Sequence, residues 1–134
     1  MSTLRVTNVQ DTAGANSLTT AQIYNGAAKA WVNFNGTFAT SPFTIDNGGI
    51  RASFNVSSIT DNGISDYTVN FTTAMVDANY STLLTARSSN DALATALANI
   101  SSQDAPTTLT IRIRTSNPGV AYIDYDHINV AVFR

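Results

Sequence analysis

The lone histidine of the chain, His127, lies beside two carboxylates, Asp124 and Asp126. Imidazole and carboxylate groups together can ligate a metal ion or act as an acid–base pair. A metal site usually needs three or four converging ligands, however, and a catalytic histidine needs a nucleophile or an orienting group. The pattern therefore favours a polar bulge exposed at the end of a sandwich over a metal or catalytic site.

A second candidate, the segment from Asp61 to Asp66, superficially resembles the start of a calcium-binding loop. The twelfth position of such a loop carries a glutamate, whereas Thr72 stands there in this chain. A hairpin turn at Asn62-Gly63 explains the same residues without an ion. The chain also lacks a Gly-x-Ser-x-Gly motif and a glycine-rich loop that opens a helix. We expect no enzyme activity, no metal and no cofactor.

The composition of the 134 residues indicates one domain with few charges and many neutral polar side chains. Only 12% of the residues are charged, glutamate is absent, and Lys29 is the only lysine. Serine, threonine and asparagine fill the deficit, and these residues suit strands and turns better than helices. A net charge of −2 argues against nucleic-acid binding, which needs a basic surface. The absence of cysteine excludes disulfides and thiol chemistry.

The elements that must position any site are β-strands, because apolar residues alternate with polar ones over most of the chain. We expect Val32 and Phe34 to share a buried face and Trp31 to lie on the opposite one. The segment 50–57 predicts a single strand that buries Phe54 and Val56, joined by the Asn62-Gly63 turn to a strand at 67–72. Further strands are expected at 80–86, 109–114 and 128–133, and a short one at 43–45.

Three local features complete this prediction. Apolar residues change phase between Tyr125 and Ile128, so a bulge or short loop is expected near Asp126 and His127. Residues 17–28 suit a capped helix ended by Gly26 or an irregular segment equally well. Residues 90–100 suit a strand slightly better than a helix. The fold class is all-β, an antiparallel β-sandwich of about seven to eight strands, with residues 1–28 as an N-terminal docking arm and residues 29–134 as the head.

Exposed apolar residues are the candidate contact sites. An alternating piece near the N-terminus suggests that the arm attaches through Leu4, Val6 and Val9. A wholly exposed tryptophan favours burial, so Trp31 is expected at a subunit interface or a ligand. Aromatic rings such as Trp31 and Tyr125 can also stack on a sugar ring, with asparagine as hydrogen-bond donor and acceptor.

The segments Lys29–Thr37 and Arg51–Met75 resemble a module of tail-fibre and related virion proteins of tailed bacteriophages, of the type found in phages of cyanobacteria and marine bacteria. The N-terminal Ser2–Gly14 and the C-terminal Ile128–Phe133 fit the same resemblance. The resemblance implies a homotrimer with a β-sandwich head, similar to an H-type lectin. It places Trp31 and Phe133 near a threefold axis.

We therefore expect a small virion component, a tail fibre, tip or knob, whose arm docks on other virion proteins and whose head faces the host. Capsid decoration or a head fibre is the alternative, followed by a carbohydrate-binding module. A host surface glycan is a possible partner, and nucleic acid and membrane insertion are not expected. The first residues lack the features of a secretory signal, so we expect synthesis in the host cytoplasm and assembly into the virion. The expected contact residues, at a subunit interface or a ligand, are Trp31, Phe133, Tyr125 and His127.

Overall fold

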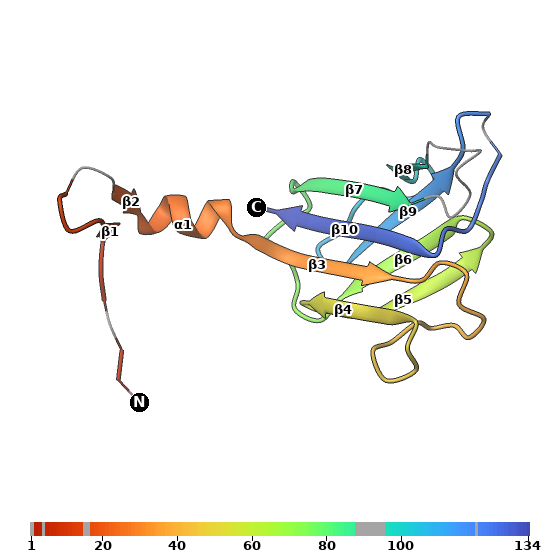
Figure 1. Ribbon diagram of the computed structural model, residues 1–134, viewed down its shortest axis with the longest axis horizontal. Helices are drawn as coiled ribbons and strands as arrows, with labels where there is room; N and C mark the ends of the chain where they lie inside the picture. The colour runs from red at the N-terminus through yellow and green to blue at the C-terminus, as the bar shows by residue number, and fades with distance from the viewer. Residues whose placement is uncertain (1, 4, 15–16, 88–95, 120) are drawn as a thin grey trace.

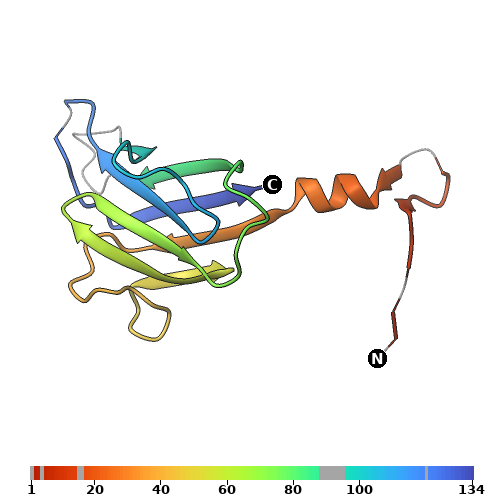
Figure 2. The same ribbon diagram turned by 180° about the vertical axis from the view of Figure 1, so that it is seen from behind.

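The computed structural model describes the chain except for residues 1, 4, 15–16, 88–95 and 120. Two four-stranded antiparallel sheets pack face to face, and an arm made of a hairpin and a short helix projects from one end (Figure 1). The C-terminus lies at that same end of the head (Figures 1 and 2). The expected all-β sandwich is therefore confirmed, with eight strands described in the head.

Each sheet brings together strands that are distant in the sequence. The first sheet, which we call the front sheet, has the order β4-β3-β10-β7, and the second, the back sheet, has the order β5-β6-β9-β8. The front strands are β3 (Ala28–Phe34), β4 (Ile50–Phe54), β7 (Ser81–Arg87) and β10 (His127–Phe133). The back strands are β5 (Val56–Gly63), β6 (Asp66–Phe71), β8 (Leu97–Ile100) and β9 (Thr110–Ser116).

The core lies between the sheets and is built from the inward residue of each alternating pair. Val32 and Phe34 of β3 are buried, as the sequence predicts, and so are Val69 and Phe71 of β6. At the centre, the ring of Phe34 meets that of Tyr67 edge to face, with centroids 5.2 Å apart. Burial of such side chains supplies the main favourable free energy of folding, at about 1.5–3 kcal/mol for each side chain.

The predicted single strand at 50–57 is wrong, because the structure divides it between the two sheets. β4 ends at Phe54, Asn55 takes a left-handed conformation with φ of 54°, and β5 starts at Val56. A register shift between Ile50 and Ala52 turns the rest of β4 over, so Phe54 faces solvent instead of the core. The Asn55 side chain holds the junction by donating to the Lys29 and Thr73 carbonyls and accepting from the Thr73 N–H.

Two shorter predictions also need correction. Asn62 and Gly63 belong to β5, and the turn into β6 falls on Ile64 and Ser65, where Ser65 takes a φ of 65°. The Gly63 N–H donates to the Asp61 side chain, and the irregular register at this point extends β5 beyond the expected turn. The expected strand at 43–45 is only an isolated bridge between Phe43 and Ile59.

The features left open by the sequence are now decided where the structure describes them. Residues 17–28 do contain a helix, α1 (Thr20–Gly26), which follows the small hairpin of β1 (Asn8–Gln10) and β2 (Ser17–Thr19). Thr19 caps it by a reciprocal exchange with Gln22. β8 begins at Leu97, and residues 88–95 lie outside the described part. The change of alternation between Tyr125 and Ile128 falls in a short loop, because β10 begins only at His127.

Candidate functional site

The outward face of the front sheet carries an apolar row that crosses all four strands. Trp31 of β3 pairs with Phe54 of β4 on one side and with Ala131 of β10 on the other. Ala131 in turn pairs with Leu83 of β7. Relative exposures of 40% for Trp31, 55% for Phe54 and 61% for Leu83 leave this row open to solvent. The outward position expected for Trp31 is therefore found, and the misplaced Phe54 joins it.

A row of neutral polar side chains lies beside the apolar row, two residues further along the strands. Asn33, Asn129 and Thr85 occupy paired positions on β3, β10 and β7. Asn33 donates to the Asn129 side-chain carbonyl, and Asn129 donates to the Thr85 hydroxyl at 3.1 Å. Arg51, on the edge strand β4, donates to the side-chain oxygen Oδ1 of Asn33 at 3.5 Å. These bonds order the three side chains into a flat strip, which we call the amide row.

A shallow groove of about 330 Å³ runs between the two rows, lined by Trp31, Leu83, Thr85, Asn129 and Ala131 among others. The surface of the groove is mostly apolar, and the amide and hydroxyl groups of the amide row border it on one side. Neither row contains an acidic side chain or a nucleophile with an adjacent base, so the groove is equipped to bind a neutral partner by contact and hydrogen bonding.

The other expected contact residues are spread over the head. Phe133 is half-buried at the end of β10 that lies nearest the arm. Tyr125 is buried in the core, and its hydroxyl donates to the Ser116 carbonyl, so it has no free ring face for a partner. His127 is half-buried, with Nδ1 3.1 Å from the Asp126 carboxylate. The structure therefore does not bring these four residues together into one site.

Asp124 has a structural role that the sequence did not reveal. Its carboxylate accepts the Ser65 N–H at 2.6 Å and the hydroxyl of Tyr67. Burial, together with the bond to Asp124, raises the pKa of Tyr67 well above its ordinary value, so the hydroxyl stays protonated as the donor. Asp124 therefore ties the loop before β10 to β6. Among the described residues, no three histidine or carboxylate side chains converge as they would around a metal ion.

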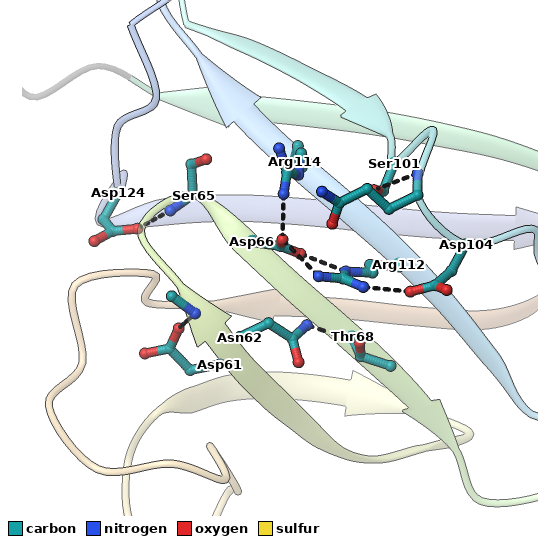
Figure 3. A network of polar contacts seen from close by, with 12 residues as sticks. Asp61, Asn62, Ser65, Asp66, Thr68, Ser101, Asp104, Arg112, Arg114 and Asp124 are labelled. Carbon is teal, nitrogen blue, oxygen red and sulfur yellow. Dashed lines mark hydrogen bonds and ion pairs between the residues drawn. The ribbon is translucent and has the colours of Figure 1, made fainter.

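The back sheet carries a charged cluster that the sequence analysis missed (Figure 3). The buried carboxylate of Asp66 accepts two bonds from Arg112, at 2.7 and 2.8 Å, and one from Arg114 at 2.7 Å. Hydrogen bonds from Arg112, and then from Arg114, hold the pKa of Asp66 below its usual value despite its burial. Arg112 also reaches the exposed Asp104. The alternation of Arg112 and Arg114 on one face of β9 was visible in the sequence, but their partner was not.

The arm exposes every one of its described residues before Ala28. Val6 and Val9, two of the three expected attachment residues, are open to solvent, and Leu4 lies outside the described residues. The structure adds Leu18, Ile23 and Tyr24 to this exposed apolar set. The helix α1 buries none of its own residues.

Together these features define the class of the chain: an antiparallel β-sandwich head with a protruding arm and one apolar outer face. Comparison with protein-family models, curated proteins and solved structures finds no match to the chain. Across the described residues, no helix combines the length and the apolar composition needed to cross a bilayer.

Proposed function

We propose that the chain is a non-enzymatic virion structural protein, a small tail fibre, tip or knob-like component. Its arm attaches it to other virion proteins, and its β-sandwich head is presented to the host surface. The resemblance of Lys29–Thr37 and Arg51–Met75 to phage fibre modules supports the class of protein. The observation that carries the proposal is the state of the arm.

The arm contains too little structure to be stable by itself. A helix of seven residues is far shorter than the roughly 12–15 residues that an isolated helix needs, and a lone two-stranded hairpin is marginal in water. Val9, Leu18 and Ile23 together expose apolar surface that folding normally removes from water. An ordered arm of this kind is explained by a partner that covers it, as attachment to a particle would.

The test is to locate the protein on virions of the phage whose genome encodes it. Antibodies against the head, detected by immunogold electron microscopy, are expected to label the tail of intact particles. When the protein is shortened by deleting residues 1–27, virions are expected to lose the antibody label. The shortened protein itself is expected to stay soluble and folded. Label over the capsid would favour the decoration or head-fibre alternative. If mass spectrometry of purified particles does not detect the protein, both the tail proposal and the capsid alternative are contradicted.

We further expect the chain to form a homotrimer, as the resemblance implies, in which the apolar residues of each arm contact both the neighbouring arms and the particle. Multi-angle light scattering of the full chain should give three times the chain mass of 14.2 kDa. Ile23→Asp should shift this mass toward the monomer, because a charge at the centre of a bundle of arms is costly to bury. Asn25→Asp, a charge two residues away and on a different side of the same helix, is the matched control. A monomer mass for the unmodified chain at micromolar concentration contradicts the trimer.

A further inference from the structure

The spacing of the two rows on the front sheet matches the two kinds of surface on a sugar. Residues two apart on a strand stand about 7 Å from each other on the same face. Trp31 and Asn33 have this relation on β3, and Ala131 and Asn129 have it on β10. A pyranose ring has an apolar face of C–H groups and a rim of hydroxyls. The electron-rich face of an indole attracts such C–H groups, while amides pair with the hydroxyls at the rim.

The amide row retains hydrogen-bonding capacity for a ligand. A carboxamide has two N–H donors and an oxygen that accepts two bonds. Counted over the described residues, Asn129 uses one donor toward Thr85 and accepts one bond from Asn33. The hydroxyl of Thr85 is used there as an acceptor, so its own proton remains available. Adjacent hydroxyls of a sugar need this mixture of donors and acceptors.

The back sheet offers no equivalent surface. The Asn70 amide donates to the hydroxyls of Ser58 and Thr60, and Asp66 is enclosed by two arginines. The exposed ring of Tyr122 lies beside these residues, but the Arg114 guanidinium lies over its face, 5.0 Å from the ring centroid. The apolar row of the front sheet has Phe133 of β10 on one side and the amide row directly next to it on the other.

We infer that the groove on the front sheet binds one pyranose ring of a neutral glycan. Trp31 stacks on the ring, while Asn33, Asn129 and Thr85 bond to its hydroxyls, and Leu83 closes the end of the groove. The inference deepens the proposed host-facing role and rests on it only for the source of the sugar. Its failure leaves the location of the protein on the virion untouched, so the two proposals are tested separately.

Trp31 is the only tryptophan, so its fluorescence reports this site directly. The probes are the methyl pyranosides of glucose, galactose and mannose and their 2-acetamido derivatives, with glycerol as a non-ring control. At least one pyranoside should shift the Trp31 emission saturably, with Kd about 1 mM, as a ligand with few non-hydrogen atoms allows. Saturation-transfer NMR should show the ring C–H protons closest to the protein. No saturable change with any of the six probes overturns the inference.

Variants assign the binding to the groove. Asn129→Ala should weaken the binding about threefold to tenfold through lost hydrogen bonds, and Trp31→Ala, followed by NMR, should weaken it by at least about tenfold. The matched controls lie on the back sheet and its flank: Asn62→Ala for the amide and Tyr122→Ala for the exposed ring. Binding that is lost in the controls but kept in Asn129→Ala places the ligand elsewhere and contradicts the inference.

A second copy of the chain is the competing occupant of this face. Phe54→Arg separates the two, because a charge on the apolar row outside the groove breaks an apolar subunit interface but leaves the groove itself unchanged. An unchanged oligomer mass for Phe54→Arg by light scattering, with Trp31 still responsive to the pyranoside, supports the sugar site. A fall in mass, with a shift of the Trp31 emission that needs no sugar, shows that the face is a subunit contact and overturns the inference.

Discussion

Replacing Phe34 with alanine is expected to lower the free energy of unfolding by about 3–5 kcal/mol. The Phe34 side chain is fully buried on β3 and contacts one ring of the back sheet and one ring of the loop before β4. Its centroid lies 5.2 Å from that of Tyr67 on the back sheet and 6.2 Å from that of Phe43. The substitution removes these contacts and opens a cavity that the rigid sheets cannot close. A loss of this size is a large part of the stability of a domain of 134 residues.

Phe54→Ala provides the matched control for this experiment. It makes the same chemical change on the adjacent strand β4, but Phe54 is 55% exposed on the outward face. We expect a loss of only about 1 kcal/mol, because more than half of its surface stays in water in the folded state. Urea unfolding of the two variants, followed by circular dichroism, measures both values. Equal losses would show that Phe54 belongs to the core or to an oligomer contact, as the alternation of 50–57 first suggests.

The substitution Asp66→Asn is expected to destabilise the head by about 2–4 kcal/mol at neutral pH. The carboxylate is buried between Arg112 and Arg114, and its loss leaves two guanidinium groups facing an amide that accepts poorly. The figure is below that for a fully buried pair because about a quarter of each arginine side chain is still exposed. Asp104→Asn is the control: it removes the exposed partner of the same Arg112 and should cost much less.

The same cluster predicts how stability depends on pH. Because Arg112 and Arg114 lower the pKa of Asp66 in the folded state, Asp66 binds protons more weakly there than in the unfolded chain. Its contribution is therefore fully present above the unfolded value of about 3.9 and is lost as the pH falls through the folded pKa. The difference in unfolding free energy between the natural chain and Asp66→Asn should shrink below about pH 4. A difference that stays constant from pH 7 to pH 3 would contradict this assignment.

The groove and the Asp66 cluster lie on opposite sheets, and this separation makes the experiments on them independent. The amide row of the front sheet keeps donors and acceptors that form no hydrogen bond within the described residues. The polar side chains of the Asp66 cluster on the back sheet instead bond to one another. Variants of Asp66 should therefore leave sugar binding unchanged, provided that the protein remains folded. Variants of Trp31 and Asn129 should in turn leave unchanged the fall in unfolding free energy that occurs below about pH 4.

Much of the fold followed from the period-two alternation of side chains. Because neighbouring residues of a strand point to opposite faces, the apolar members of 31–34, 67–71 and 128–132 identify the buried face without any tertiary information. The same rule placed Trp31 outward. It also located the loop before β10, since the phase change at 125–128 cannot be accommodated in one regular strand.

What the sequence determined by itself is thus the class of the fold, the buried faces of most strands and the outward direction of Trp31, because these depend on local alternation and turn residues. Only the tertiary structure decided that the segment 50–57 crosses between the sheets at Asn55, which turns Phe54 outward. It alone joined Asp66 to Arg112 and Arg114, and placed Asn33 beside Asn129. Alternation says which face a side chain takes, but strand order and register decide its neighbours, and these are set by packing between segments far apart in the chain.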